Sequence, residues 1–279
     1  MKRITAIACW SLTATLMTGC AFDANFPQDD EALGEAESQL LVWNALNPNA
    51  LNPNALNPNA LNPNALNPNA LSPSALLSLQ DPGSSGDLSR QLLRYTVSCA
   101  FSPSQSFSFS WTDTFGVVHP ETYSGLLGLA VSWANTRLST SGAEWVSACL
   151  ASRVNWYGAT VTISSRGPAE HLATTSEERA GYPAIEGAFF GNLFTTTPAL
   201  YSCYNATNVD NSRAQQRDCA TGHLNPDGSV SSCGMLQVLG SCSDYCSSIE
   251  TTRRYYPSCF TSSDQLGTPM STVVTTALP

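Results

Sequence analysis

The spacing of apolar residues along the chain predicts two helices that each turn one face toward a core. Apolar side chains recur every three or four positions over residues 88–100, and again over residues 143–155. Cys99 lies on the apolar stripe of the first segment and Cys149 on that of the second. Both cysteines should therefore be buried. The expected N-cap residues of the two helices are Asp87 and Ser141.

Strands are predicted where polar and apolar residues alternate. Serine and aromatic residues alternate over 106–111, and a turn at 113–116 leads back into a second strand at 117–118. β-Branched residues predict another strand over 159–164. Several glycines interrupt the aromatic segment 181–194, for which the pattern predicts a loop with helical pieces. Separate helices and hairpins together indicate an α+β fold.

The first twenty residues have the pattern of an export signal. A positive start at residues 1–3 is followed by 14 almost uncharged residues at 4–17, too few to span a bilayer. The segment ends in Leu-Met-Thr-Gly-Cys and resembles a bacterial lipoprotein signal, in which the cysteine receives the lipid. An ordinary signal peptide that ends beside a cysteine by chance is the alternative. We expect residues 1–19 to be a lipoprotein signal peptide and Cys20 to carry the lipid, with Ala21 favouring the outer membrane.

The charges of the chain are unevenly distributed. It has 12 basic and 21 acidic residues, a formal net charge of −9, and its one lysine is Lys2 in the export signal. The stretch 20–44 is expected to be a solvated acidic tether, since it holds six acids and no base. An acidic chain without lysine attracts polyanions poorly, so nucleic acid is not an expected partner. We also expect no cofactor.

A low-complexity repeat follows this tether. Five perfect copies of Ala-Leu-Asn-Pro-Asn run over residues 45–69, and a degraded sixth copy follows at 70–74. A proline at every fifth position excludes a long helix or a central strand, and Asn-Pro-Asn-Ala favours turns. A pentapeptide-repeat β-helix is the alternative, but these units make only about one and a half coils, fewer than a solenoid needs. We expect a disordered or turn-rich spacer over residues 45–80 that holds a domain clear of the membrane.

Tandem repeats behind a lipoprotein signal resemble those of a set of uncharacterised lipoproteins from myxobacteria. The segments 92–100, 145–155 and 186–194 are similar to the domain that this set shares. The resemblance implies an outer-membrane location, with the domain displayed on the cell surface. It implies no particular chemistry.

The cysteines indicate how the globular domain, expected over residues 81–279, is stabilised. Eight remain once Cys9 in the signal and the lipidated Cys20 are set aside, and an even number in an exported chain predicts four disulfides. Cys99 and Cys149 are expected to pair, because both lie on buried helix faces. The other six fall in a cysteine-rich C-terminal lobe at 203–259. The eight are Cys99, Cys149, Cys203, Cys219, Cys233, Cys242, Cys246 and Cys259.

Three other kinds of chemistry are less well supported by the spacing. Zinc would need thiolates, but the spacings and the oxidising compartment favour disulfides; the residues concerned are Cys219, His223, Cys233, Cys242 and Cys246. A calcium loop at 223–234 lacks acids at its first and last positions, so residues 225–228 are better interpreted as a tight hairpin turn. A thiol hydrolase using Cys149 with His119 or His171 would leave an odd number of cysteines to pair.

Glu186 is the candidate for a catalytic acid. It is the one acid set among apolar residues, where burial would raise its pKa. The alternative is a structural ion pair with an arginine such as Arg153 or Arg166. Other acids include possible glycosidase pairs, but no spacing marks two of them as partners: Glu121, Glu144, Glu170, Glu177 and Glu178. Four tryptophans have nearby tyrosines and are candidates for stacking on sugars or for core positions: Trp111, Trp133, Trp145 and Trp156.

Taken together, these patterns predict a surface-displayed lipoprotein anchored in the outer membrane by the lipid on Cys20. Its disulfide-rich domain is expected to be a binding or structural module for an unknown extracellular or envelope ligand. A membrane-tethered extracellular hydrolase is the alternative. The surroundings of Glu186 discriminate between them: an open cleft with a second carboxylate favours the hydrolase, and a buried arginine partner favours the module.

Overall fold

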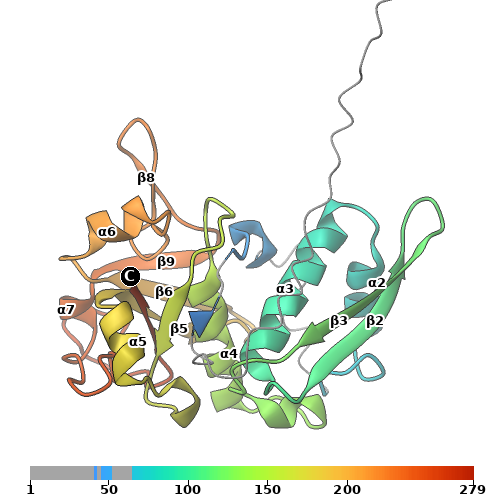
Figure 1. Cartoon of the computed structure of the whole chain (residues 1–279), viewed down its shortest axis with the longest axis horizontal. Coiled ribbons are helices and arrows are strands. Elements are labelled where there is room, and N and C mark those ends of the chain that lie inside the picture. The colour runs from blue at the N-terminus through green and yellow to red at the C-terminus, as the bar shows by residue number, and fades with distance from the viewer. Residues whose placement is uncertain (1–40, 43–44, 52–64) are drawn as a thin grey trace, which may run out of the picture. The chain divides into compact units, whose positions relative to one another are not determined.

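The computed structural model describes residues 41–42, 45–51 and 65–279, all within one compact unit. They form an α+β domain with four disulfide bonds, which confirms the fold class expected from the sequence (Figure 1). Residues 1–40, which include the export signal and Cys20, lie outside the described residues. The repeat residues 52–64 also lie outside them.

A six-stranded sheet organises the domain, in the strand order β1-β4-β10-β5-β6-β9. Neighbouring strands are antiparallel, except that β6 and β9 run parallel. The C-terminal strand therefore lies inside the sheet, between two strands from the middle of the sequence (Figure 1). The strands are β1 (Leu41–Val42), β4 (Ile163–Arg166), β5 (Ala184–Asn192), β6 (Ala199–Tyr204), β9 (Leu236–Ser241) and β10 (Val274–Leu278).

β5 corrects the expectation of a loop with helical pieces over residues 181–194. The strand is buried on both faces, so its sequence lacks the alternation of apolar and polar residues that marks a half-buried strand. Its glycines allow close contact with β6. A Cβ on Gly187 would lie 2.2 Å from the carbonyl oxygen of Cys203, and one on Gly191, whose φ is +127°, would lie 2.3 Å from that of Ala199.

Three helices form successive layers on one side of the sheet, and only the last of them packs directly on its strands. α2 (Pro73–Gln80) packs on α3 (Ser84–Ala100), α3 packs on α4 (Thr140–Arg153), and α4 packs on β5, β6 and β10. The two helices predicted from periodicity are confirmed, and the disulfide between Cys99 and Cys149 joins them. Shorter helical segments are η1 (Pro48–Leu51), η2 (Val131–Ala134), η3 (Glu170–Leu172), α5 (Ser176–Gly181), α6 (Val209–Ala214) and α7 (Cys242–Tyr245).

Both expected N-caps are wrong by a few residues. α3 begins after Gly83, and Asp87 lies in its first turn. A negative charge there stabilises the helix by its favourable interaction with the helix dipole. α4 begins after Ser139, whose Oγ accepts a hydrogen bond from the backbone N of Gly142 at 3.0 Å, and Ser141 lies inside the helix.

Two hairpins project from this framework. β2 (Ser106–Thr112) and β3 (Val118–Ser124) form the predicted hairpin, which packs against α3. β7 (His223–Leu224) and β8 (Val230–Ser231) form the second one. The tight turn predicted at residues 225–228 is confirmed, because the N of Gly228 donates to the carbonyl oxygen of Asn225 at 2.9 Å.

The cysteine-rich segment 203–259 contributes the end of β6 and all of β9 to the central sheet. Its residues Cys219 and Cys233 belong to the core on the helical side, whereas its other four cysteines belong to a second core on the opposite face of the sheet. Phe190 of β5 belongs to the core on this side, whereas its neighbour Phe189 belongs to the helical side. The side chains of this second core are Ile185, Ala188, Phe190, Cys203, Cys242, Cys246, Tyr256, Cys259, Val273 and Ala277.

The described residues of the repeat form turns, as expected for a turn-rich segment, and these turns pack into the core. Leu46, Ala50 and Leu51 are 0% exposed, Leu66 is 1% and Leu71 is 8% exposed. The predicted Asn-Pro-Asn-Ala turn is confirmed in both described parts of the repeat. The domain therefore begins before residue 81. The leucines recur at every fifth position, which matches neither the period of a helix nor that of a strand. The spacing of apolar residues therefore did not predict that these leucines are buried.

Candidate functional site

Glu186, the catalytic candidate from the sequence, forms a buried structural ion pair. Its Oε2 accepts hydrogen bonds from Nη2 of Arg217 and Oγ1 of Thr276, each at 2.8 Å. Both charged side chains are 0% exposed. Arg217 also donates to the carbonyl oxygens of Val154 at 2.7 Å and Ser152 at 3.0 Å, at the C-terminal end of α4. The pair thus ties β5 to α4 and faces no cleft.

The two arginines suggested by the sequence as partners are buried elsewhere. Nε of Arg166 donates to Oγ of Ser164 at 2.8 Å, and its Nη2 donates to the carbonyl oxygen of Tyr182 at 2.6 Å. Ser164 in turn donates to Glu178 at 2.7 Å. Burial lowers the pKa of Arg166, and that of Arg153, to about 10. Both guanidinium groups therefore stay charged at neutral pH inside the protein.

All eight domain cysteines are paired, which confirms the four predicted disulfides and the pairing of Cys99 with Cys149. A paired cysteine offers no thiolate to a substrate or to zinc. The thiol-hydrolase use of Cys149 is therefore wrong, and so is the zinc alternative. Each bridge contributes about 2–4 kcal/mol of stability. The pairs are Cys99–Cys149, Cys203–Cys242, Cys219–Cys233 and Cys246–Cys259.

Four side chains meet at the surface beyond the end of α4: Trp156, Tyr157, Asp218 and His223, called the Trp156–His223 site below. The His223 ring stacks on Trp156, with centroids 4.4 Å apart and planes at 9°, and meets Tyr157 edge-on at 5.3 Å. Nδ1 of His223 lies 2.7 Å from Oδ2 of Asp218, which also accepts a hydrogen bond from Tyr157 at 3.0 Å. The Asp218 side chain is fully buried, while Trp156 and Tyr157 are 40% and 44% exposed.

A turn after α4 positions the two aromatic residues. Oδ1 of Asn155 accepts a hydrogen bond from the N of Tyr157 at 2.8 Å, and Gly158, at φ +63°, completes the turn. Nδ2 of Asn155 donates to the carbonyl oxygens of Ala159 at 2.9 Å and Gln216 at 3.0 Å. The buried amide of Asn155 thus joins the turn to the segment that carries Asp218.

The other half of the site is positioned by a disulfide. Cys219 follows Asp218 directly and is bonded to Cys233, beyond the β7–β8 hairpin. Thr221 reinforces the turn between Asp218 and His223, since its N and Oγ1 both donate to the carbonyl oxygen of Asp218 at 2.9 Å. The backbone on both sides of the carboxylate is therefore fixed.

The site presents a supported imidazole at an aromatic surface. Asp218 fixes the orientation of the His223 ring, and Nε2 has no hydrogen-bond partner in the described part of the chain. Partial burial, and then the hydrogen bond to the Asp218 carboxylate, raise the pKa of Tyr157, so its hydroxyl remains protonated. A ligand can thus meet the rings and two polar groups at one place.

A second stacked histidine lies on the β2–β3 hairpin. His119 stacks on Trp111 at 4.5 Å, and its Nε2 lies 2.9 Å from Oδ2 of Asp113, which lowers the pKa of that carboxyl group. The guanidinium of Arg90 lies 3.8 Å over the Trp111 ring, and Nε1 of Trp111 donates to Glu121 at 3.0 Å. The Trp111 side chain therefore packs between the hairpin and Arg90 of α3, and it helps to hold the hairpin against this helix.

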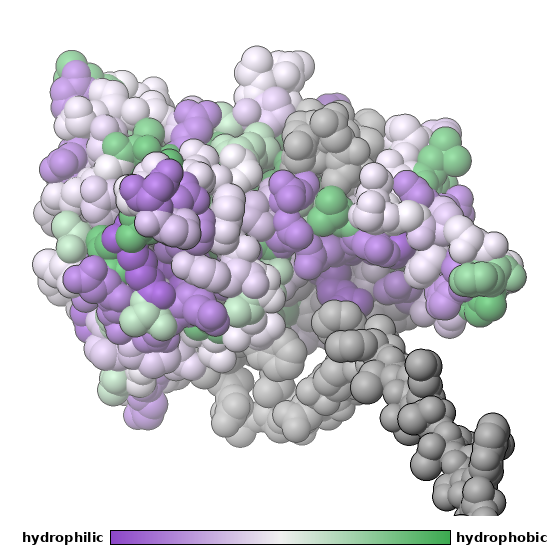
Figure 2. Space-filling view, turned by 90° about the horizontal axis from the view of Figure 1, so that it is seen from above, coloured by the Kyte–Doolittle hydropathy of each residue, from purple (hydrophilic) through white to green (hydrophobic). Residues whose placement is uncertain are grey.

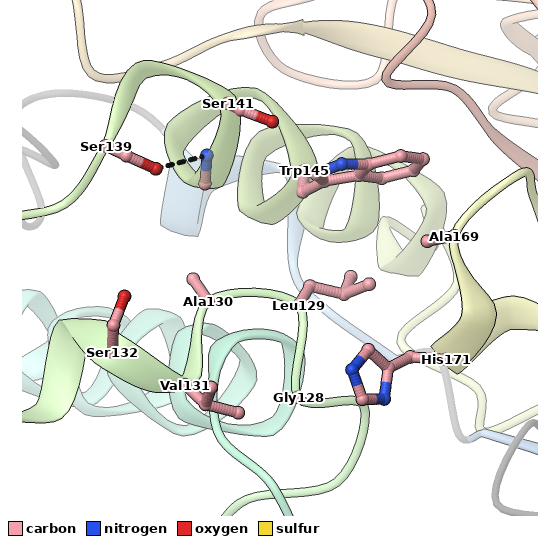
Figure 3. Close-up of a pocket in the computed structure, with 11 residues that line it drawn as sticks. Gly128, Leu129, Ala130, Val131, Ser132, Ser139, Ser141, Trp145, Ala169 and His171 are labelled. Carbon is pink, nitrogen blue, oxygen red and sulfur yellow. Dashed lines mark hydrogen bonds between the residues drawn. The ribbon is translucent and has the colours of Figure 1, made fainter.

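His171 lines a pocket of about 310 Å³ between the first turns of α4 and the segment 128–132 (Figure 3). Its ring points toward Gly128, and Trp145 of α4 lies on the opposite wall (Figure 3). Ser139 and Ser141 contribute hydroxyl groups, but none of the described lining residues is acidic or basic apart from His171. The pocket has no carboxylate to orient this imidazole.

Sequence reasoning identified part of the Trp156–His223 site. Trp156 was a stacking candidate and His223 a possible metal ligand, whereas Asp218 and Tyr157 were missed. The adjacent aromatic residues after a predicted helix were the available signal for Tyr157. Asp218 and His223 meet because of the turn closed by the Cys219–Cys233 bond, and that pairing is not encoded in their spacing. Trp133, in contrast, is a fully buried core residue.

Hydrophobic side chains are dispersed over the part of the surface that Figure 2 shows. On the face seen in Figure 2, hydrophobic residues form small patches separated by polar ones. Within residues 41–42, 45–51 and 65–279, we find no helix with the length and apolarity that a membrane span requires. Four disulfides fit an exported protein.

Comparison with known proteins gives no match to a family model, a curated protein or a solved structure.

Proposed function

We propose that this protein is an exported lipoprotein, held at the outer membrane by a lipid on Cys20, whose domain binds an extracellular carbohydrate at the Trp156–His223 site. The observation that carries the binding function is the exposure of Trp156 and Tyr157, 40% and 44%, in a cluster fixed by a buried carboxylate. Ordered aromatic side chains that remain exposed are typical of binding surfaces.

The chemistry of the site favours a sugar. A sugar ring has an apolar C–H face that packs on an indole, and hydroxyl groups at its edge that need hydrogen bonds. The His223 ring, which stacks on Trp156, and the hydroxyl group of Tyr157, whose ring meets His223 edge-on, are the polar groups of the cluster that can offer them. The net charge of −9 disfavours a strongly anionic polymer, so a neutral polysaccharide is the ligand class we propose.

The anchor is supported by the sequence of the export signal and by the disulfides of the domain. Acyl chains on one cysteine attach a protein to a bilayer because each buried methylene contributes about 0.8 kcal/mol. Replacing Cys20 with serine should move the protein from the membrane fraction to the soluble fraction and remove the acyl mass seen by mass spectrometry. Cys9→Ser is the control, because Cys9 lies in the signal that is removed. This substitution should change neither the membrane fraction nor the acyl mass. Retention of Cys20→Ser in the membrane would contradict the anchor.

Trp156→Ala should weaken binding of the Cys20→Ser protein to a neutral polysaccharide. Insoluble cellulose, chitin and β-glucan are suitable probes, with the bound fraction measured against ligand concentration. Loss of a central aromatic contact costs about 2 kcal/mol, a roughly thirtyfold weaker affinity. Phe115→Ala is the matched control, because Phe115 is 91% exposed but lies at the tip of the other hairpin. Equal effects of the two substitutions, or no binding to any probe, would contradict the proposal.

A hydrolase is the second candidate, and one observation favours it. A histidine whose Nδ1 is held by a buried carboxylate has the arrangement of a general base and its orienting group. The same polysaccharide mixtures distinguish the two functions. If the protein releases soluble sugar from a polysaccharide and the His223→Asn variant does not, the site is catalytic.

A further inference from the structure

The domain holds two copies of one heptapeptide, and each forms a turn that begins at its third residue. Ala-Leu-Asn-Pro-Asn-Ala-Leu occupies residues 45–51 and again residues 65–71. In each copy the third residue is the first residue of the turn: the carbonyl oxygens of Asn47 and Asn67 accept from the sixth residue at 2.9 and 3.0 Å. Their side-chain oxygens accept from the fifth residue at 2.9 and 3.1 Å. In each copy the two leucines are buried and the fifth residue is exposed.

Backbone hydrogen bonds attach the first copy to the domain. The N of Leu46 donates to the carbonyl oxygen of Arg153 at 3.1 Å, and its carbonyl oxygen accepts from the N of Asn155 at 3.0 Å. Leu46 and Val154 thus form a short parallel bridge at the end of α4. The chain adds to the domain as an extended peptide does in β-augmentation.

Side chains of α3 complete this contact. Oε1 of Gln91 accepts a hydrogen bond from the N of Asn47 at 3.1 Å, and the Tyr95 hydroxyl oxygen accepts from the N of Ala45 at 2.9 Å. Burial raises the pKa of Tyr95, so the hydroxyl stays protonated. We call the groove formed by α3, residues 153–155 and Gly234 the repeat site.

Gly234 allows the proline of the repeat to approach. Its φ is +62°, and a Cβ there would lie 2.4 Å from the carbonyl oxygen of Pro48. The second copy makes different contacts: the N of Leu66 donates to the carbonyl oxygen of Trp133 at 2.7 Å, and Nδ2 of Asn67 donates to that of Ala134 at 3.2 Å. The domain therefore recognises the same seven residues at two places.

The sequence contains this heptapeptide in overlapping copies, at 45–51, 50–56, 55–61, 60–66 and 65–71. A spacer needs only polar and proline residues, whereas every unit here has the same leucine. The contacts described above for the repeat site are made by the first four of the seven residues, and each of the other copies has the same four residues.

We propose that the repeat site is a peptide-binding site for Ala-Leu-Asn-Pro-Asn-Ala-Leu that accepts the copies at 45–51, 50–56 and 55–61, so that the chain changes register in steps of five residues. Each step frees one unit on the membrane side and lengthens the tether by about 15 Å, at roughly 3 Å per extended residue. The step separates β1 from β4, a pairing of two residues only.

Leu46→Asp in the full chain tests this proposal. Residues 50–56 should fill the site, so the melting temperature should fall by only a few degrees. Leu79→Asp is the control, because Leu79 is also 0% exposed but belongs to α2 and has no substitute in the repeat. Its melting temperature should fall several times further, and so should that of a quadruple variant with aspartate at positions 46, 51, 56 and 61. Hydrogen exchange should show protection moving from residues 45–49 to residues 50–56.

Three results would overturn the proposal. One is equal stability of the single and quadruple variants, whether both are stable or both are unstable. Another is that Leu46→Asp leaves the hydrogen exchange of residues 50–56 as it is in the unsubstituted protein. The third is a recovery that depends on protein concentration and accompanies a dimer in ultracentrifugation, since a neighbouring chain would then supply the repeat.

Discussion

Replacing Arg217 with methionine is expected to lower the free energy of unfolding by about 3–5 kcal/mol. The substitution leaves the Glu186 carboxylate in the core without its cation, although Thr276 still donates to it. It also removes the donors to the carbonyl oxygens of Ser152 and Val154 at the end of α4. Denaturant unfolding with the disulfides intact measures the loss.

Glu186→Gln provides the matched control for this prediction. The amide keeps the volume of the side chain and removes its charge, so the double variant with Arg217→Met should be more stable than Arg217→Met alone. This recovery is the signature of a charge left uncompensated. If Arg217→Met costs less than about 1 kcal/mol, or the double variant is no better, the buried pair does not stabilise the fold as described.

The sequence predicted those elements whose burial follows a helix or strand period. α3 buries one stripe, whereas α4 is buried all round from Val146 to Arg153. Their two cysteines lie on the apolar stripes that the sequence predicts, which is why one disulfide could be assigned. β5 escaped prediction because it is buried on both faces and its glycines pack against β6. The other three disulfides, one of which joins β6 to α7, connect segments whose neighbours only the folded chain defines.

The repeat is a second case in which the sequence predicts a local conformation but not its packing. Asn-Pro-Asn-Ala forms the turn that its residues favour, so the local conformation was predictable. Its packing was not, because the leucines depend on a groove assembled from α3, the end of α4 and a glycine near β9. The Trp156–His223 site is similar: the aromatic residues were visible in the sequence, and their carboxylate partner was not.

Placing the repeat in the core changes how the proposed anchor relates to the domain. The acidic segment leads from Cys20 into β1 and the first docked copy, so the chain joins the domain at the edge of the central sheet. With the proposed anchor and the proposed change of register, the distance between membrane and domain would depend on how many repeat units are docked, and it would change in discrete steps.

The most direct test of the docked repeat compares the thermal unfolding of residues 81–279 with that of residues 41–279, both with four disulfides intact. The shorter fragment lacks five buried leucines, at positions 46, 51, 66, 71 and 79. Burial of a leucine contributes about 1.5–3 kcal/mol, so together they contribute on the order of 10 kcal/mol before the cost of ordering the chain. A domain has about 5–15 kcal/mol in total. We predict that residues 81–279 show no cooperative transition, or one at least about 10 °C lower. Equal melting temperatures for the two fragments would contradict the claim that the repeat is part of the core.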